Sequence, residues 1–386
     1  MTRVVIAGGG TGGHLYPGVA VARELLRREP DAQVTFAGTA RGLEATLIPK
    51  EGFALDVIRS VGVKGRSAVK ALRGLAMVPV SLADAWALLS RRRPHVVIGV
   101  GGYSSGPVVL TAALRGIPTM LLEQNAVPGL TNRLLARVVR AAALTYDDTW
   151  NYFGRRGFVT GNPVRPEFYS SPTADPSHSA DPSDITDPSH IADRASAIAH
   201  GPSRITHGPR VLILGGSQGA HAINVAMVAV SAELVRRNAG LEVVHQTGQR
   251  DLAVVREGYA RAGIDARAEP FLDGVAREMI AADLVICRAG ATTLAELAAV
   301  GRPAVLVPFP AATDDHQRKN ADVLAAAGAA VTIRESDLTP DRLTDVVQAL
   351  LGDADRRARM SRAMRTFARP QAAAAIVDRL LELAAA

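Results

Sequence analysis

The sequence contains little cysteine, few aromatic residues and no long uninterrupted apolar stretch. Cys287 is the only cysteine among 386 residues, which excludes an intramolecular disulfide framework and fits a reducing compartment. Aromatic residues make up 4% and no nucleic-acid-binding signature is present, so nucleic acid is not an expected partner. The most apolar stretch, Gly74 to Ser90, is interrupted by Pro79 and Asp84. At the N-terminus, the apolar run is too short for a signal peptide because glycines interrupt it. We therefore expect a cytoplasmic protein that does not span a membrane.

The charges that are present are unevenly placed. Residues 1–165 hold 21 basic and 10 acidic side chains, whereas the remainder holds 23 and 27. Such a basic N-terminal half favours an anionic partner. Within it, Lys64, Arg66, Lys70 and Arg73 are interleaved with apolar residues, a pattern that suits contact with an anionic membrane surface. An ordinary solvated basic helix explains this pattern equally well.

Composition and length indicate a globular protein with two domains and a linker between them. Hydrophobic residues make up 48% and charged residues 21%, and the length suffices for two ordinary domains. Residues 171–209 are rich in Ser, Pro, Asp and Ala and cannot bury enough apolar surface to fold. We expect domains at 1–165 and 210–369, a disordered linker at 166–209, and a C-terminal helix at 370–386 that packs back on the N-terminal domain.

The two flanks of this linker resemble each other. Residues 4–14 and 211–221 both run from an apolar strand through a glycine-rich turn into helix-forming sequence. A second unit repeats later in each half, at 96–102 and 284–290, where another apolar strand ends in glycine. Strands that alternate with helices through short glycine-bearing turns indicate parallel, doubly wound sheets. The predicted fold class is α/β, with two Rossmann-like domains that face each other across a cleft.

The first glycine turn suits an anion but lacks the acid of a dinucleotide site. Gly8, Gly10 and Gly13 match the spacing G-x-G-x-x-G, which frees backbone N–H groups at a helix start for a phosphate. A fold that binds NAD also places an acid at the end of its second strand, to hold a ribose hydroxyl. Residues 34–37 form the expected second strand and no acid follows directly, although Arg41 leaves NADP open. An NAD-dependent dehydrogenase is therefore disfavoured.

The second glycine turn, Gly215 to Ala220, repeats this arrangement and suits a diphosphate. Arg165 and Arg288 lie where guanidinium groups could grip such a group, and the alternative for Arg288 is a structural ion pair. No Asp-x-Asp pair lies in a suitable loop to hold a divalent ion. We therefore expect neither a metal nor another cofactor.

Two further side chains have both a chemical and a structural interpretation. Glu296 lies in the first turns of a predicted helix, where a carboxylate can hold the two hydroxyls of a ribose or simply cap the helix. His14 follows the first glycine turn and can take a proton from an attacking alcohol, or can shape the loop as a polar residue. Because His221 occupies the parallel place in the second half, we expect only one of the two histidines to be the base.

Seven motifs together make the chain resemble the MurG family of peptidoglycan glycosyltransferases. The resemblance covers essentially the whole chain except residues 171–209. The motifs are Gly9-Gly10-Thr11-Gly12-Gly13-His14, Gly101-Gly102-Tyr103-Ser104-Ser105-Gly106-Pro107, Glu123-Gln124-Asn125, Gly161-Asn162-Pro163-Val164-Arg165, Gly215-Gly216-Ser217-Gln218-Gly219-Ala220, Cys287-Arg288 and His316-Gln317.

This resemblance implies a GT-B fold and a specific reaction. The C-terminal domain would bind UDP-GlcNAc, and the N-terminal domain would bind a lipid-linked acceptor as a peripheral protein at the cytoplasmic face of the cell membrane. The implied enzyme is an inverting hexosyltransferase that moves GlcNAc to the C4 hydroxyl of MurNAc in undecaprenyl-pyrophosphoryl-MurNAc-pentapeptide, converting lipid I to lipid II. The implied partners are these two substrates and an anionic membrane surface, with cell-wall assembly proteins as further candidates.

The resemblance also implies roles for individual residues. His14 would deprotonate the acceptor hydroxyl, with Glu123 as a competing base. Glu296 would hold the ribose and the backbone at Leu272 the uracil. The remaining expected donor contacts are Thr11, Gly12, Gly13, Asn125, Arg165, Ser217 at the phosphate, Ala291, Thr292, Thr293, Leu294, Ala295, and Gln317 at the GlcNAc hydroxyls. The expected contacts of the acceptor and its pyrophosphate are Gly102, Tyr103, Ser104 and Arg288.

The sequence departs from the family pattern at two places, and two other functions remain open. Ala295 stands where a hydroxyl-bearing residue commonly precedes the ribose glutamate, so one hydrogen bond to the donor is expected to be missing. The insertion at 171–209 puts the geometry of domain closure in question, but a longer loop costs little free energy. The alternatives are a UDP-GlcNAc 2-epimerase, which needs no acceptor, and a non-catalytic module that binds a nucleotide sugar.

Overall fold

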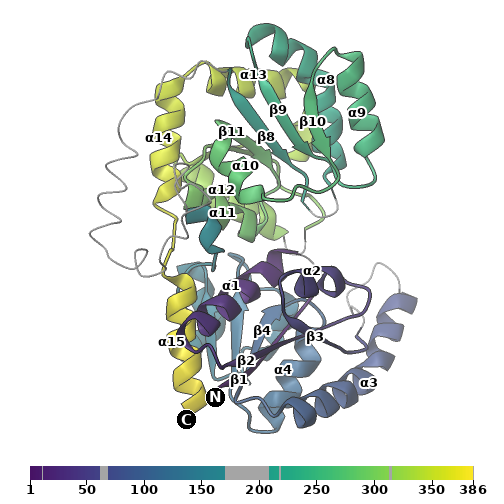
Figure 1. Ribbon diagram of the computed structural model, residues 1–386, viewed down its shortest axis with the longest axis vertical. Coiled ribbons are helices and arrows are strands. Elements are labelled where there is room, and N and C mark those ends of the chain that lie inside the picture. The colour runs from purple at the N-terminus through teal and green to yellow at the C-terminus, as the bar shows by residue number, and fades with distance from the viewer. Residues whose placement is uncertain (11, 61–67, 170–207, 217–218, 313–314, 386) are drawn as a thin grey trace.

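The computed structural model describes residues 1–10, 12–60, 68–169, 208–216, 219–312 and 315–385. Within these residues the strands form two parallel sheets, one in each half of the chain (Figure 1). The two halves stack along the long axis of the molecule, with the C-terminal half above the N-terminal half in Figure 1.

The N-terminal sheet has the strand order β3-β2-β1-β4-β5-β6-β7. Its strands are β1 (Arg3–Gly8), β2 (Gln33–Gly38), β3 (Ala54–Val57), β4 (Val96–Gly101), β5 (Thr119–Glu123), β6 (Ala141–Leu144) and β7 (Gly157–Val159). The helices of this half are α1 (Gly12–Arg28), α2 (Glu44–Lys50), α3 (Ala68–Arg92), α4 (Ser105–Leu114), α5 (Leu130–Leu135) and α6 (Trp150–Phe153), with short 3-10 turns at Asp147–Thr149 and Gly154–Arg156. The order reverses between β1 and β4, which is where open sheets of this type bind their ligands.

The C-terminal sheet has the order β10-β9-β8-β11-β12-β13, which reverses between β8 and β11. Its strands are β8 (Arg210–Leu214), β9 (Glu242–Gln246), β10 (Ala266–Glu269), β11 (Leu284–Cys287), β12 (Ala304–Leu306) and β13 (Ala330–Thr332). The helices of this half are α8 (His221–Arg237), α9 (Leu252–Arg261), α10 (Val275–Ala281), α11 (Ala291–Val300), α12 (His316–Ala326), α13 (Pro340–Leu351) and α14 (Ala354–Arg365), with a 3-10 turn at Glu335–Asp337. The predicted α/β fold with two Rossmann-like sheets is confirmed.

The central strand β1 is buried on both faces, which explains its continuous apolar sequence. Val4 and Ile6 pack into one hydrophobic cluster, while Val5 and Ala7 pack into a second cluster on the opposite face. Successive side chains of a strand point to opposite faces, so helices on both sides remove all four from water. The same residue pattern recurs in β8, where Val211 joins one cluster and the next residue joins the other.

The C-terminal helix α15 (Ala372–Ala385) lies against the N-terminal domain, beside α1 (Figure 1). Its residues Ile376 and Leu380 are fully buried in the cluster that also contains the β1 side chains. Arg28 of α1 forms an ion pair with Asp378 of α15. The end of the chain thus ties the C-terminal domain back to the first one.

The linker expected at 166–209 lies mostly outside the described residues. Its first four residues form a short 3-10 helix, η3 (Pro166–Tyr169), whose Phe168 packs into the core of the C-terminal domain. The chain therefore first packs on the C-terminal domain at the start of the expected linker, well before the boundary expected at residue 210.

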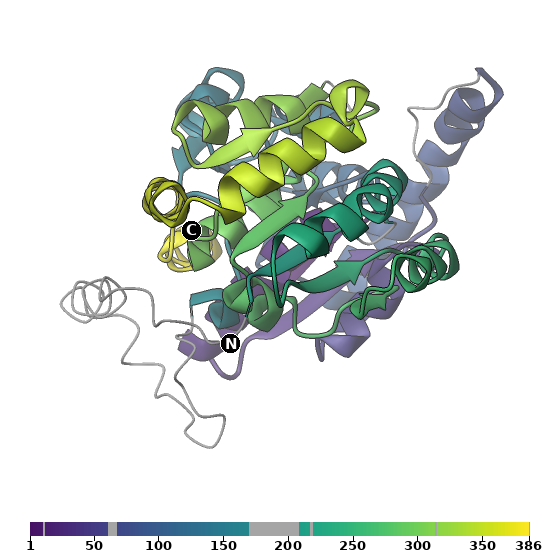
Figure 2. The same ribbon diagram turned by 90° about the horizontal axis from the view of Figure 1, so that it is seen from above.

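The first turns of α3 extend away from the rest of the N-terminal domain in both views (Figures 1 and 2), whereas Ala85, Leu88 and Leu89 in its second half are buried in the core. Among the described residues, no helix combines the length and the apolarity that crossing a membrane would require.

Candidate active site

The two domains meet at the strand ends that carry the glycine turns. The first turn links β1 to α1, and the second links β8 to α8. Between the domains, the Thr292 hydroxyl donates a hydrogen bond to the Gly13 carbonyl at 2.7 Å, and the backbone N–H of Ala126 donates to Asn320 Oδ1 at 3.1 Å. Residues from both halves therefore line one site, as expected for this fold.

A further glycine loop, after β4, closes on the first glycine turn. Gly102 has φ +81° and lies so near Gly9 that a Cβ would stand 2.2 Å from the Gly9 carbonyl oxygen. The adjacent Tyr103 exposes 38% of its surface, whereas Ser104 is fully buried and its hydroxyl has no hydrogen-bond partner among the residues that the structure describes. Of these three predicted acceptor contacts, Tyr103 is the most exposed, Gly102 is partly exposed and Ser104 is buried.

His14 stands in the first turn of α1, at the junction of these loops. Its Nδ1 lies 3.3 Å from Gln124 Oε1, and Gln124 Nε2 donates to the Val100 carbonyl at 3.1 Å. Because the Gln124 amide uses its nitrogen on Val100, its oxygen faces His14, and Nδ1 must carry the proton. Nε2 then keeps a lone pair. Burial lowers the pKa of His14, which favours the neutral imidazole that a general base requires.

Glu123, the competing base, lies at the end of β5 and is 2% exposed. Its Oε1 accepts hydrogen bonds from the Asn125 backbone at 3.0 Å and side chain at 3.3 Å. Its Oε2 accepts from the Gly129 backbone at 3.1 Å and from Asn132 Nδ2 at 2.8 Å. Burial raises the pKa of Glu123, against these hydrogen bonds. Both oxygens already accept hydrogen bonds from the loop that follows β5, so neither is free to take a proton from the acceptor. The geometry therefore favours His14 over Glu123 as the base.

Glu296 and Arg165 form a pair at 3.2 Å between Oε1 and Nη2. Glu296 lies on the second turn of α11 and is 7% exposed, and its burial raises its pKa to about 7, with Arg165 acting in the opposite direction. The Arg165 guanidinium also stacks over the ring of Tyr16, 4.0 Å from its centre. Two predicted donor residues, one just before the linker and one in the C-terminal domain, are thus brought together, and Tyr16 joins them from α1.

Asn125 connects the loop that follows β5 to the C-terminal domain. Its Oδ1 accepts from Asn320 Nδ2 at 3.4 Å, and Asn320 is fully buried on α12. Asn162 adds a second link, because its Nδ2 donates to the Thr292 hydroxyl at 3.4 Å. Asn320 was not predicted from the sequence, because its partners Asn125 and Ala126 lie nearly 200 positions away and leave no local signal.

The other predicted donor residues lie around these links. Leu272 is buried between β10 and α10, and Gln317 Oε1 accepts from the Phe309 backbone at 2.9 Å. Ala291, Thr293, Leu294 and Ala295 belong to the start of α11, next to Glu296. Thr11 and Ser217 lie outside the described residues.

Arg288 takes up the structural role that the sequence left open. Its Nη1 pairs with Glu335 at 2.5 Å and donates to the carbonyl of Val307 at 3.2 Å. Its guanidinium also lies 5.3 Å from the centre of the Phe309 ring. The expected pyrophosphate contact of Arg288 therefore competes with three partners inside its own domain.

One acid near the first glycine turn was not foreseen. Glu44, six residues beyond β2, is fully buried and its Oε2 accepts a hydrogen bond from the Gly10 N–H at 3.1 Å. No acid directly follows β2, and Glu44 reaches the turn because the short helix α2 folds back over it.

Two of the four residues expected at the membrane belong to α3. Lys70 and Arg73 belong to this helix, whereas Lys64 and Arg66 lie outside the described residues. Further along α3, Trp86 is 56% exposed, and Arg115 from the end of α4 stacks on its ring at 4.6 Å.

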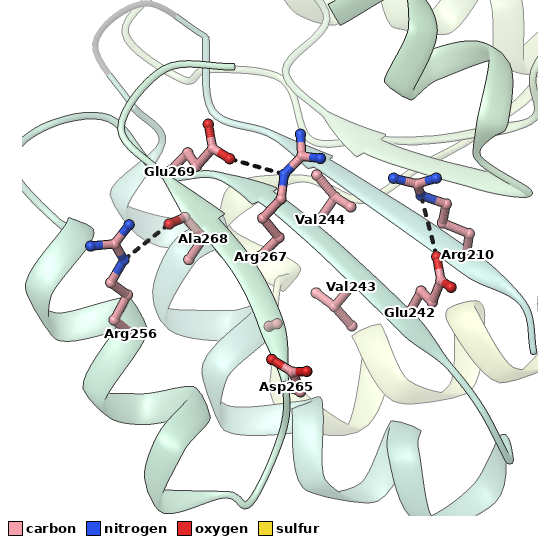
Figure 3. A pocket seen from close by; sticks show the side chains of 10 residues that line it. Arg210, Glu242, Val243, Val244, Arg256, Asp265, Arg267, Ala268 and Glu269 are labelled. Atoms are coloured by element: carbon pink, nitrogen blue, oxygen red, sulfur yellow. Dashed lines mark hydrogen bonds and ion pairs between the residues drawn. The ribbon is translucent and has the colours of Figure 1, made fainter. Parts of the chain in front are cut away.

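A groove of about 580 Å³ lies away from this site, on the face of β8, β9 and β10 (Figure 3). Its charged side chains largely neutralise one another. Arg267 pairs with Glu269 at 2.9 Å, and Arg210 lies 3.7 Å from Glu242. None of the predicted site residues lines it.

Comparison with known proteins agrees with this arrangement. The glycosyltransferase family 28 N-terminal domain matches residues 4–144, and its C-terminal domain matches residues 210–376. A protein of Anaeromyxobacter dehalogenans named UDP-N-acetylglucosamine--N-acetylmuramyl-(pentapeptide) pyrophosphoryl-undecaprenol N-acetylglucosamine transferase is 44% identical, over 99% of this chain and 93% of that protein. The crystal structure of Acinetobacter baumannii MurG superimposes with a TM-score of 0.72 at 29% identity, covering 99% of this chain and all of that one. This chain belongs to the MurG family.

The MurG family shares its architecture with other nucleotide-sugar enzymes. A UDP-GlcNAc 2-epimerase from Neisseria meningitidis, solved with UDP-GlcNAc bound, superimposes with a TM-score of 0.65 at 12% identity, covering 99% of this chain and all of that one. At such low identity the likeness concerns the fold alone. Membership of the MurG family confirms the predicted family and enzyme class.

Proposed function

We propose that this protein transfers GlcNAc from UDP-GlcNAc to the C4 hydroxyl of MurNAc in undecaprenyl-pyrophosphoryl-MurNAc-pentapeptide, with inversion at the transferred sugar. The names of its MurG relatives support the choice of both substrates. The observation that carries the chemistry is the arrangement of His14, whose Nδ1 is engaged by Gln124 and whose Nε2 keeps a lone pair.

In the proposed step, His14 accepts the proton of the attacking hydroxyl. The acceptor oxygen bonds to C1 of GlcNAc while the bond between C1 and the diphosphate oxygen breaks, and UDP leaves with that electron pair. Attack on the face opposite UDP inverts the configuration at C1. General base catalysis of this kind contributes about 10² to 10⁴ in rate.

The donor is proposed to bind the C-terminal domain. Glu296 accepts hydrogen bonds from the ribose hydroxyls, and Arg165, 3.2 Å away, favours the ionised form of this carboxylate. The backbone at Leu272 contacts the uracil and Gln317 the GlcNAc hydroxyls. The second glycine turn and the N-terminus of α8 stabilise the departing diphosphate through backbone N–H groups and the helix dipole, with Ser217 as a further contact.

The acceptor is proposed to reach the site from a membrane at the cytoplasmic face, which the outer surface of α3, α4 and α5 contacts. This surface exposes 56% of Trp86, 76% of Leu114 and 71% of Leu134. Arg115 lies beside Trp86 and supplies positive charge to the same surface. Exposed apolar side chains beside cations suit the interface of an anionic leaflet.

Incubation with labelled UDP-GlcNAc and a short-chain lipid I analogue tests this function. The expected product carries GlcNAc on the C4 oxygen of MurNAc with the opposite anomeric configuration, and UDP appears in equal amount. Epimerisation or UDP release without acceptor would favour a 2-epimerase. Binding of UDP-GlcNAc without any turnover would favour a non-catalytic module.

A further inference from the structure

A buried carboxylate that the proposed reaction does not use is built into the first glycine turn. Glu44 is 0% exposed and stands in the first turn of α2. Its Oε1 accepts hydrogen bonds from the Thr39 backbone at 2.9 Å and from the Thr39 hydroxyl at 2.7 Å. Its Oε2 accepts from the backbone N–H of Gly10 at 3.1 Å. One side chain thus joins the ends of β1 and β2 at the rim of the site.

Three glycines leave the space that this carboxylate fills. A Cβ on Gly42 would stand 2.1 Å from Glu44 Oε2, and a Cβ on Gly9 would stand 2.5 Å from Oε1. A Cβ on Gly38 would stand 2.6 Å from the Glu44 Cγ. Glycine at these positions is therefore required by the acid as well as by the turn.

The bond from Gly10 fixes the turn two residues before α1 begins. Gly10 has φ +96°, a conformation that L side chains rarely adopt and that a partner on its N–H stabilises. His14 lies in the first turn of that helix, against Gly101, where a Cβ would be 2.8 Å from its Nδ1. The imidazole therefore packs closely against Gly101, and a shift of the turn would displace it from this position.

The two glycine turns differ in this respect although their sequences are alike. In the second turn, a Cβ on Gly216 would meet no atom of the described residues within 4 Å, although a Cβ on Gly215 or Gly219 would lie within 3 Å of backbone atoms. In the first turn, the N–H of Gly10 already has an anionic partner, so a phosphate at that amide would face a carboxylate. The first turn is therefore better suited to positioning than to anion binding.

We propose that Glu44 is a positioning residue for the transfer reaction, which holds the first glycine turn so that His14 meets the acceptor hydroxyl. This proposal rests on the proposed function of His14 as the base. Glu44 touches no substrate in this account, and it acts on the rate through His14 alone.

Glu44→Gln is the direct test because it keeps the size of the side chain. The amide must direct its NH₂ group at the Gly10 N–H or at the Thr39 N–H, and two donors then face each other. We expect kcat to fall about 10- to 100-fold, since small displacements of reacting groups have effects of this size. The dissociation constant of UDP-GlcNAc should change much less than kcat, because most of the proposed donor contacts lie in the other domain. Glu51→Gln is the matched control, because Glu51 caps the same helix but pairs with Arg23.

A double-mutant cycle separates positioning from general support of the fold. In a His14→Ala background, Glu44→Gln should change the residual rate by less than about twofold, because its effect acts through the missing imidazole. An equal loss of rate in both backgrounds would overturn the proposal. Thr39→Val, which removes one of the three hydrogen bonds, is the milder variant if Glu44→Gln does not fold. It should give a smaller loss with the same dependence on His14.

The imidazole signals of His14 in a ¹⁵N-labelled protein give a readout that needs no turnover. Glu44→Gln should shift these signals and their titration midpoint, whereas Glu51→Gln should leave both in place. Unshifted signals would overturn the positioning role even if transfer is observed. Absence of transfer in the wild-type protein would instead refute the proposed function, while shifted signals would still support the contact between turn and base.

Discussion

The hydroxyl of Thr292 donates a hydrogen bond to the carbonyl oxygen of Gly13 at 2.7 Å. Thr292 belongs to α11 of the C-terminal domain, and Gly13 directly precedes His14 in the N-terminal domain. The proposed base is therefore one residue away from a direct bond between the domains. Domain closure and the placement of the imidazole should be coupled through this bond.

Thr292→Val should weaken this coupling. The substitution keeps the shape of the side chain but leaves the Gly13 carbonyl and the Asn162 amide without a partner, at a cost of about 1–3 kcal/mol. We expect kcat/KM to fall about 5- to 100-fold in steady-state transfer assays. Thr46→Val, an exposed position on α2, should leave kcat/KM unchanged. Wild-type kcat/KM in Thr292→Val would show that the cross-domain bond is unimportant.

Donor binding should depend on pH through Glu296. Burial raises the pKa of this carboxyl to about 7, so it is protonated below that pH and ionised above it. The ionised carboxylate can accept a hydrogen bond from each ribose hydroxyl, whereas the protonated form carries a donor O–H on one of its two oxygens. The affinity for UDP-GlcNAc, measured by calorimetry, should therefore rise between about pH 6 and pH 8.

Glu296→Gln provides the control for this pH dependence. It should bind UDP-GlcNAc more weakly than the wild type at pH 8, and its affinity should not change across the same range. A wild-type affinity that is flat with pH, or a slope that survives in Glu296→Gln, would exclude Glu296 as the titrating group.

Glu123→Gln should act on stability more than on proton transfer. Each oxygen of Glu123 accepts two N–H donors, so an amide nitrogen at either place would oppose a pair of donors. We expect a loss of about 1–3 kcal/mol in the free energy of unfolding, measured with urea. The pH profile of kcat should keep its midpoint. A profile that loses its basic group would instead make Glu123 the base.

The exposed surface of α3 and α4 should control membrane association. Replacing both Trp86 and Leu114 by Ala removes two exposed apolar side chains, each worth about 1–3 kcal/mol when buried. Sedimentation with anionic vesicles should show at least a tenfold weaker partition. The matched pair Val225→Ala and Val254→Ala, exposed on α8 and α9 of the other domain, should partition like the wild type. Equal partition of both pairs would place the membrane contact elsewhere.

The fold was predictable because its signals are local. The apolar runs at Val4 and Val211 are each followed by a glycine turn, and both became central strands at the points where the strand order reverses. Parallel strands buried on both faces produce such runs, so two of them with matching turns indicate two doubly wound sheets.

The site was only partly predictable because several of its contacts are long-range. His14 and Glu296 could be identified from their positions after glycine turns. Glu44 could not, because it reaches the first turn from a short helix beyond the next strand. Asn320 was missed for the same reason, since its partners at Asn125 and Ala126 come from the other domain. Such contacts are set by tertiary packing and leave no pattern in the local sequence.

The central claim is that the acceptor loses its proton to His14. The most direct measurement compares His14→Ala with the wild type in single-turnover transfer from saturating UDP-GlcNAc to a short-chain lipid I analogue. We predict a rate about 10² to 10⁴ times lower, with the UDP-GlcNAc dissociation constant unchanged within about twofold. A His14→Ala protein that transfers GlcNAc at a rate within a few fold of the wild type would contradict the account.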